Sequence, residues 1–287
     1  MSATGTELGA VDPKVLVEAR LQTHHAAQWL ARAARANLPP QPDDSHTNLG
    51  WDQERDALTS HPLARSDAGP MCLGLRIVPL TLLVTIGDEL LDELALDGKR
   101  DAEAAAWIDQ HADASGLRAP SSAILPYVIP NHPVAAGGRY ASAAHTSAFA
   151  VLARWLAFAD DVLQETRGRI AQIGTGASPV RCWPHHFDIA TSLRLKDGDA
   201  ETASSIGIGM SPGDEYYAQP YFYVSPWPRP QAATLPDPPI PGHWHTKDFV
   251  AAVVTGDGLL ASGDPRGMAR SFLDAAIVAS RSLLGAS

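Results

Sequence analysis

The sequence predicts an α+β protein with a mainly antiparallel sheet and helices packed on it. Strand-like segments follow one another directly, which disfavours a doubly wound fold, where helices alternate with strands. Long segments with helical apolar spacing stand at the ends of two halves of the chain. The 23 glycines and 23 prolines supply many turns between these elements.

The first predicted helix begins at Asp12, which can cap it, and Pro13 suits its first turn. It should end before the pair Pro39-Pro40, because proline cannot continue a helix. Three strands and a second helix are then predicted at residues 46–51, 75–86, 94–96 and 100–110.

Residues 116–142 contain four prolines and the pair Gly137-Gly138, and no long periodic segment fits there. We predict that this segment is a connector. It would join an N-terminal α+β half at 14–115 to a C-terminal α+β half at 143–287, after a disordered N-terminus at 1–13.

The C-terminal half begins with the clearest helix of the chain, predicted at 146–167 with its apolar residues on one stripe. Its strands are predicted at 178–195, 205–210 and 221–225. The proline-rich segment 226–241 should be extended and lead through His243 to a helix that starts at Thr246. The last helix begins at Pro265, with Asp264 as its cap.

Both halves therefore run from a helix through strands to a helix. Each first strand also carries a polar pair at alternate positions, His46 with Asn48 and His186 with Asp188. This suggests two αβββα halves that arose by duplication. The same order of elements is common in α+β proteins, so two unrelated halves remain the alternative.

The composition, with 45% hydrophobic and 19% charged residues, is that of a globular protein. A formal charge of −10 opposes binding to phosphate backbones, so no nucleic-acid partner is expected. No apolar stretch approaches the roughly 20 residues that cross a bilayer, and no signal-peptide pattern is present, so we expect a cytoplasmic protein without a membrane partner. Cys72 and Cys182 lack CxxC spacing and should be free buried thiols.

Ser211 lies in Gly209-Met-Ser-Pro-Gly213, which matches the G-x-S-x-G pattern of hydrolase nucleophiles. The following residue, Pro212, has no N–H for an oxyanion hole, so we interpret the segment as a turn. A serine hydrolase is a distant third hypothesis. No glycine cluster has the spacing of a phosphate loop, so no nucleotide cofactor is expected.

Gly207 and Gly209 share one face of their predicted strand and permit close approach by another backbone, an aromatic ring or a ligand. Tyr221 and Tyr223 share a face of the next strand. There they either line a cleft or pack with their hydroxyls bonded.

The eleven histidines are the main chemical signal, because several are spaced to share a face with a carboxylate or an amide. Such groups form general acid/base pairs or bind a divalent metal. The candidate catalytic residues are His185, His186, Asp188 and Asp214. The candidate ligands of a divalent metal, whose identity the sequence leaves open, are His24, His46, His186 and Asp188. The alternative is that these residues make structural hydrogen bonds, and an Asp after Pro-Gly is also typical of a turn.

Several motifs occur in order between residues 24 and 228. His24 is followed four residues later by Gln28, and a later segment is His46-Thr-Asn48. Ser178-Pro-Val180 precedes His185-His-Phe-Asp-Ile-Ala190. The last motifs are Gly209-Met-Ser-Pro-Gly-Asp214, Pro220-Tyr-Phe-Tyr223 and Pro226-Trp-Pro228.

In this order the motifs resemble a family of uncharacterised bacterial proteins that is catalogued only as a domain of unknown function. The chain departs from the family pattern at Pro184 and Ser211, where that pattern has Trp. The resemblance implies a shared pattern that includes His24, Gln28, His185, Asp188 and Asp214, and it implies no activity.

We therefore expect an enzyme that acts on a small molecule through the His/Asp cluster, in a cleft between the halves. The alternative is a non-catalytic binding or assembly protein with an apolar partner surface around Trp227 and Trp244. The sequence leaves the substrate, the reaction and the oligomeric state open.

Overall fold

The computed structural model describes residues 7–174, 176–198 and 203–286. It confirms the α+β class. The chain forms two compact units that do not follow the sequence order. Unit 1 comprises Met1–Val15, Arg154–Val180 and Asp188–Ser287, and unit 2 comprises Leu16–Ala153 and Arg181–Phe187. Of the predicted disordered N-terminus, residues 1–6 lie outside the described residues, whereas Leu8 is buried.

Unit 2 is built around helix α2 (Val17–Asn37). The sequence predicts a helix from Asp12 and Pro13 onward, whereas Pro13–Leu16 form a 3-10 turn and the α-helix begins at Val17. Asp12 accepts a hydrogen bond from the Lys14 N–H at 2.9 Å, which satisfies one free donor at the start of this segment. The helix is rich in alanine and is buried along most of its length. It ends where Leu38 takes an extended conformation before Pro39.

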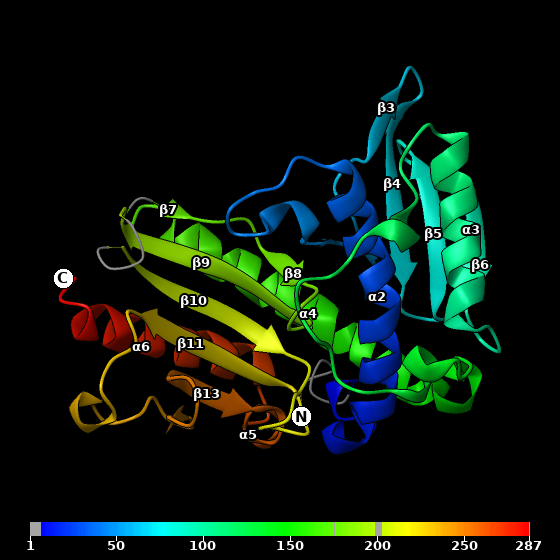
Figure 1. Cartoon of the computed structure of the whole chain (residues 1–287). Coiled ribbons are helices and arrows are strands. Elements are labelled where there is room, and N and C mark those ends of the chain that lie inside the picture. The colour runs from blue at the N-terminus through cyan, green and yellow to red at the C-terminus, as the bar shows by residue number, and fades with distance from the viewer. Residues whose placement is uncertain (1–6, 175, 199–202, 287) are drawn as a thin grey trace. The chain divides into compact units, whose positions relative to one another are not determined.

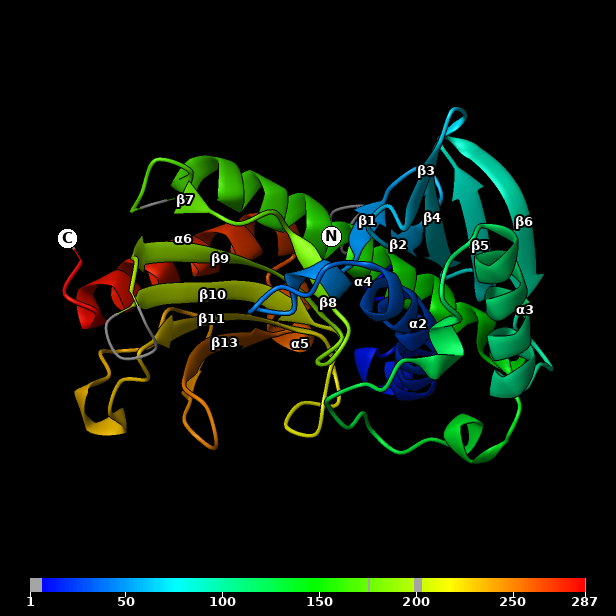
Figure 2. The same ribbon diagram turned by 45° about the horizontal axis from the view of Figure 1, so that its top comes forward.

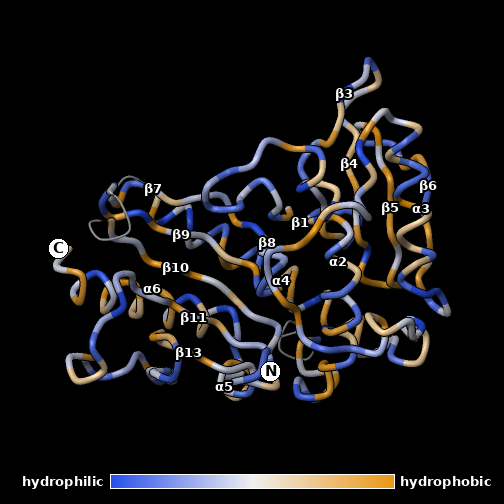
Figure 3. The backbone as a smooth tube through the Cα atoms, viewed as in Figure 1, coloured by the Kyte–Doolittle hydropathy of each residue, from blue (hydrophilic) through white to orange (hydrophobic). Residues whose placement is uncertain are grey.

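The sheet of unit 2 is antiparallel, with the order β1-β2-β4-β5-β6 and with β3 paired to β4. Its most hydrophobic stretches run along β4 and β5 (Figure 3). Helix α3 (Asp101–Ala114) follows the sheet. The strands are β1 (Gly50–Asp52), β2 (Ala57–Thr59), β3 (Ala64–Ser66), β4 (Gly69–Arg76), β5 (Thr81–Ile86) and β6 (Glu89–Ala95).

Two strand predictions in this unit were wrong. The predicted strand 75–86 is a hairpin, in which Leu75 lies opposite Leu82. Pro79 lies in the turn, where its missing N–H costs no ladder hydrogen bond. His46 is in a 3-10 turn (Ser45–Thr47) and not in a strand, which begins only at Gly50.

The segment 116–142 contains no long helix or strand, as predicted. It has 3-10 turns at Pro120–Ser122 and Pro133–Ala136 and ends at a third, Ser142–His145. The turns at Pro120 and Pro133 pack against α2. The segment is therefore part of the wall of unit 2.

Unit 1 has an antiparallel sheet with the order β12-β13-β11-β10-β9-β7. Helix α4 (Thr146–Ile170), of which residues 154–170 belong to this unit, and helix α6 (Pro265–Leu283) cover one face of the sheet (Figures 1 and 2). The strands are β7 (Gly176–Ala177), β9 (Asp188–Lys196), β10 (Ser204–Ser211), β11 (Tyr221–Trp227), β12 (His243–His245) and β13 (Ala251–Thr255).

Side chains alternate between the two faces of this sheet. Phe222 faces the helices and meets Phe158 of α4 edge to face, at 5.9 Å between ring centroids. Arg266 of α6 joins the two helices, because it pairs with Asp161 at 2.9 Å and with Glu165 at 2.6 Å. Tyr221 and Tyr223 lie on the opposite face, which we call the tyrosine face; Tyr221 is buried there with Ala251 and Val253.

The structure also corrects the C-terminal prediction in two places. The predicted strand 178–195 is broken after β8 (Arg181–Trp183) by a turn in which Phe187 has a φ of 57°. The predicted helix at Thr246 is absent. Strand β13, whose Val-Val-Thr run suits a strand, comes first, and the short helix α5 begins at Gly256. No helix within the described ranges is both long and apolar enough to cross a membrane.

Candidate functional site

Unit 2 contains a pocket with a volume of about 480 Å³, which is within the range of small-molecule sites. One wall is a polar stripe on α2, and another is the segment 124–135 that the sequence predicts as a connector. The residues of α2 and α3 that line it are His25, Gln28, Trp29, Arg32 and Asp101.

The polar wall arises from helical spacing, because His25, Trp29 and Arg32 lie on one face of α2 at successive turns. The Trp29 indole N–H donates to Asp101 Oδ1 at 2.8 Å. The Arg32 guanidinium lies 5.5 Å from the centroid of the same indole. It also donates to the carbonyl oxygen of Ala123. One indole therefore holds an anion at its edge and a cation near its face.

Asp101 is the first residue of α3, where the helix dipole favours a carboxylate. Its Oδ1 also accepts a hydrogen bond from the Tyr140 hydroxyl at 2.9 Å. Burial raises the pKa of Tyr140 well above its usual value, and the neighbouring Asp101 adds to this effect. The phenol therefore stays protonated and serves as a fixed donor to Asp101.

His25 is buried beside this carboxylate. Its Nε2 lies 2.9 Å from the Pro130 carbonyl oxygen, and because a carbonyl only accepts, Nε2 carries the hydrogen. Burial lowers the pKa of His25, which favours the neutral ring, although Asp101 acts in the opposite direction. No described residue bonds to Nδ1. In the neutral ring this nitrogen carries the lone pair, and the ring of His132 lies nearby, with 5.5 Å between the ring centroids.

His24 and Gln28, which belong to the motif pattern, meet the turn that precedes Asp188. His24 Nε2 and Gln28 Nε2 both donate to the Pro184 carbonyl oxygen at 2.8 Å. The His24 ring also stacks on Phe187, with 5.0 Å between the ring centroids. Burial lowers the pKa of His24 to about 4. This pair therefore fixes the turn as a neutral structural clamp.

Tyr127 connects this clamp to the pocket wall. Its hydroxyl donates to Gln28 Oε1 at 2.9 Å, while the Gln28 amide nitrogen donates to the carbonyl oxygens of His24 and Pro184. Burial raises the pKa of Tyr127 to about 12. Both the oxygen and the nitrogen of the Gln28 amide are therefore hydrogen-bonded, and Gln28 holds the segment 124–131 against α2.

The other predicted histidines of unit 2 lie in different surroundings. His185 is half-buried between the rings of Tyr127 and Trp183, at centroid distances of 5.7 and 6.0 Å, and burial lowers its pKa to about 4. His186 is exposed, although its ring lies 4.2 Å from that of His185. His46 accepts a hydrogen bond from the Gln41 N–H at Nδ1, at 3.2 Å.

The predicted carboxylates lie in unit 1, where each accepts a hydrogen bond from a tyrosine. The Tyr223 hydroxyl donates to Asp188 Oδ2, and the Tyr221 hydroxyl donates to Asp214 Oδ2 at 2.5 Å. Asp214 Oδ1 accepts from the backbone N–H groups of Tyr216 and Tyr217, at 2.8 and 2.9 Å. Asp214 thus acts as a turn residue, the alternative that the sequence leaves open.

Ser211 ends β10, and its Oγ accepts a hydrogen bond from the Gly213 N–H at 3.2 Å. The chain continues into a loop and not into a helix. A hydrolase nucleophile elbow requires a strand followed directly by a helix. The segment therefore lacks the strand-to-helix geometry of such an elbow, and the predicted turn begins only after Ser211.

Tyr217 lies between His243 and His245, which were not predicted as site residues. His245 Nε2 lies 2.6 Å from the Lys247 carbonyl oxygen and must donate to it. A neutral His245 therefore accepts the Tyr217 hydroxyl at Nδ1, at 3.0 Å. The same hydroxyl oxygen lies 2.7 Å from His243 Nε2, which must then donate. The result is a directed chain from His243 through Tyr217 to His245.

Among the described residues, no three His, Cys, Asp or Glu side chains form a group that could hold a metal ion. The tryptophans of the predicted partner surface differ from each other. Trp227 is 51% exposed, whereas the Trp244 indole is half-buried and donates to the Pro236 carbonyl oxygen at 2.9 Å.

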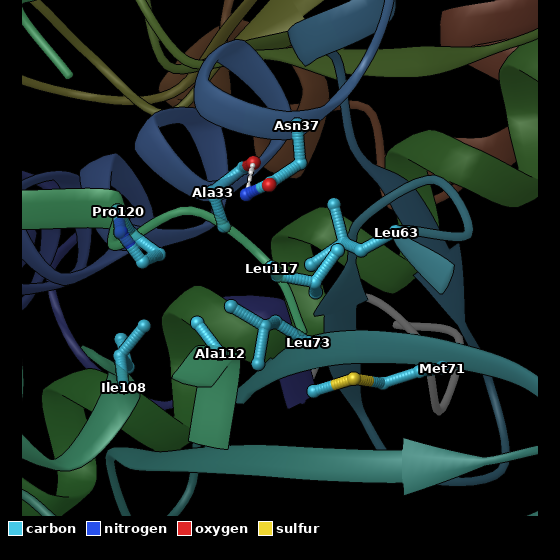
Figure 4. A pocket seen from close by; sticks show the side chains of 9 residues that line it. All are labelled: Ala33, Asn37, Leu63, Met71, Leu73, Ile108, Ala112, Leu117 and Pro120. Atoms are coloured by element: carbon cyan, nitrogen blue, oxygen red, sulfur yellow. Dashed lines mark hydrogen bonds between the residues drawn. The ribbon is translucent and has the colours of Figure 1, made fainter. Parts of the chain in front are cut away.

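A second hollow in unit 2 is lined mainly by apolar side chains, among them Leu63, Met71, Leu73 and Ile108 (Figure 4). It is too small to admit a water molecule. Asn37 at its rim donates to the Ala33 carbonyl oxygen at 3.0 Å. This hollow is therefore part of the packed core.

Most residues that line the pocket were not predicted as site residues. The spacing of His25, Trp29 and Arg32 was a usable signal, because three such residues on one helical face are unusual for an otherwise alanine-rich helix. Asp101 and Tyr127 gave no comparable signal, since tertiary folding brings them to that face.

No protein-family model, no curated protein and no solved structure matches this chain.

Proposed function

We propose that this chain is an enzyme that binds a small organic molecule in the pocket of unit 2. The pocket supports this proposal most directly, because it combines a sufficient volume, apolar walls and three chemically different polar groups within one compact unit. His25 is the catalytic base of the proposal, since it is neutral near pH 7 and its Nδ1 bonds to no described residue. Asp101 stabilises the imidazolium that forms when His25 takes a proton.

His24, Gln28 and Tyr127 then act as positioning residues that hold the pocket wall. This proposal differs from the sequence prediction in its residues, since it assigns the chemistry to His25 and Asp101. The roles predicted for His185, His186, Asp188 and Asp214, and a divalent metal, remain predictions from the sequence.

A pair of neighbouring alanines provides the binding test. Ala135 lines the pocket and is exposed, so Ala135→Trp should fill the pocket without disturbing the core. Ala136 is also exposed and does not line the pocket, which makes Ala136→Trp the matched control. Ligand-observed NMR would screen mixtures of anionic, cationic, zwitterionic and neutral metabolite-sized compounds. We expect hits that Ala135→Trp abolishes and Ala136→Trp retains; equal binding by both variants would overturn the pocket assignment.

Catalysis is tested on the compounds that bind. Each is incubated with the native chain or with His25→Gln, and its conversion is followed by mass spectrometry. We expect conversion by the native chain, and a variant that still binds but converts at least about 100-fold more slowly, the usual contribution of a general base. Bound compounds that the native chain leaves unchanged would instead favour the second candidate, a non-catalytic binding protein. The extensive structural bonding of His24 and Gln28 agrees with that candidate.

A further inference from the structure

The pocket contains one cation and one anion that the described part of the chain does not pair with each other or with an opposite charge. Arg32 contacts the Ala123 carbonyl oxygen and the Trp29 ring, and no described carboxylate forms an ion pair with it. Asp101 accepts hydrogen bonds from two neutral donors, the Trp29 indole and the Tyr140 hydroxyl, and no described lysine or arginine pairs with it. Partly buried charges of this kind gain most from a partner of opposite charge.

Both charges belong to the same small region, because one indole contacts both side chains. A molecule whose own charges are a few bonds apart can therefore reach both. Asp101 Oδ1 is already used twice, which leaves Oδ2 as the acceptor for an ammonium group. The guanidinium of Arg32 presents several N–H donors, a geometry that suits a carboxylate.

Much of the remaining wall of the pocket is aliphatic, although Tyr127 and Asn131 also line it. Ile124 and Val128 are 86% and 92% exposed, and Leu125 and Ile129 line the pocket beside them. Large aliphatic side chains with such exposure are unfavourable in water, and an apolar ligand would cover them. The wall therefore favours a ligand with an aliphatic chain.

We propose that the pocket binds a zwitterion with a free ammonium group, a free carboxylate and an aliphatic side chain, as in aliphatic α-amino acids and short peptides with free ends. Asp101 binds the ammonium group, Arg32 binds the carboxylate, and the segment 124–129 covers the aliphatic chain. This inference rests on the proposed function, because it names the ligand class of the same pocket.

The test is isothermal titration of the full chain with four probes. Leucine and leucyl-leucine carry both charges, N-acetyl-leucyl-leucine lacks the ammonium group, and leucyl-leucine amide lacks the carboxylate. We expect each missing charge to weaken binding about tenfold or more relative to leucyl-leucine, the usual worth of a charged hydrogen bond. The relative affinities of leucine and leucyl-leucine distinguish an amino acid from a peptide.

Two variants assign the charges to residues. Arg32→Gln should bind leucyl-leucine about tenfold more weakly but bind its amide as the native chain does. Asp101→Asn keeps an oxygen acceptor for Trp29 and Tyr140. It should bind leucyl-leucine about tenfold more weakly but bind N-acetyl-leucyl-leucine as the native chain does. Arg35→Gln and Asp113→Asn are the matched controls. Arg35 is on the same helix but pairs with Asp44 at 2.8 Å, and Asp113 is an exposed residue of α3.

The outcomes separate this inference from the proposed function. If the native chain binds none of the probes, or binds all of them equally, the zwitterion assignment is wrong. It is also wrong if Arg32→Gln and Asp101→Asn show the native preferences. In these cases the comparison of Ala135→Trp with Ala136→Trp still tests the proposed function, because that comparison does not depend on the ligand class.

Discussion

The ring of Tyr223 lies across Gly209 on the neighbouring strand, so closely that a Cβ at residue 209 would stand 2.6 Å from the Tyr223 hydroxyl oxygen. The two residues are direct cross-strand partners on the tyrosine face of the sheet in unit 1. Glycine is required there because Tyr223 passes over it to reach Asp188, and because a Cβ would also stand 2.8 Å from the Cβ of Ala190. Of the possibilities that the sequence leaves open for Gly209, the structure shows the approach of an aromatic ring.

Gly209→Ala should therefore push Tyr223 away from Asp188. We expect the free energy of unfolding to fall by roughly 1–3 kcal/mol, as for other overpacked positions. Gly207→Ala is the control, because a Cβ there would have no heavy atom closer than 3.8 Å. Urea unfolding of both variants checks this, and equal stability of the two would contradict the stated role of Gly209.

Tyr127→Phe should loosen the wall of the pocket. It removes the donor to Gln28 Oε1, so we expect a loss of about 1 kcal/mol and faster proteolysis within residues 124–131. Tyr216→Phe is a suitable control, since that hydroxyl bonds Asp248 in unit 1. Limited proteolysis with mass spectrometry would locate the cuts. An unchanged cleavage rate in this segment would show that Tyr127 does not hold it.

His24 should make the protein less stable in acid. Burial lowers its pKa from 6.5 to about 4, so the unfolded chain binds a proton more readily than the folded chain does. The destabilisation caused by His24 is therefore absent above pH 6.5, and it grows as the pH falls from 6.5 toward 4. A shift of this size corresponds to on the order of 3 kcal/mol.

Urea unfolding between pH 7.5 and pH 4.5 measures this loss. His24→Gln should show a flatter dependence on pH than the native chain, whatever its stability at pH 7.5. If His24→Gln loses stability with falling pH as steeply as the native chain, His24 is not the group responsible.

The chain from His243 through Tyr217 to His245 predicts the tautomer of both rings. Each neutral histidine should carry its hydrogen on Nε2, because His245 donates to the Lys247 carbonyl oxygen and His243 donates to Tyr217. Nitrogen NMR of the imidazole rings would show this directly. Tyr217→Phe should remove the bond to His243 and leave the Nε2 hydrogen of His245 in place. An Nδ1 hydrogen on His245 in the native chain would disprove the order of donors.

Local patterns determined several features of this protein. The prolines around α2, the Asp264 cap and Pro265 of α6, the apolar stripe of α4 and the turn residues of the segment 116–142 act over a few neighbouring residues, so the sequence predicts them well. The hairpin of β4 and β5 and the short strand β13 were missed. Strand pairing depends on a distant partner, which spacing alone does not identify.

The sequence by itself determined the α+β class and the main helices. Only the tertiary structure decided that His24 and Gln28 meet the turn at Pro184 as a structural clamp, and that the neighbouring His25 lines a pocket. It also brought Asp101 and the segment 124–131 to the same face of α2. The physical reason is that helical spacing fixes which side chains share a face, whereas long-range packing fixes what that face meets.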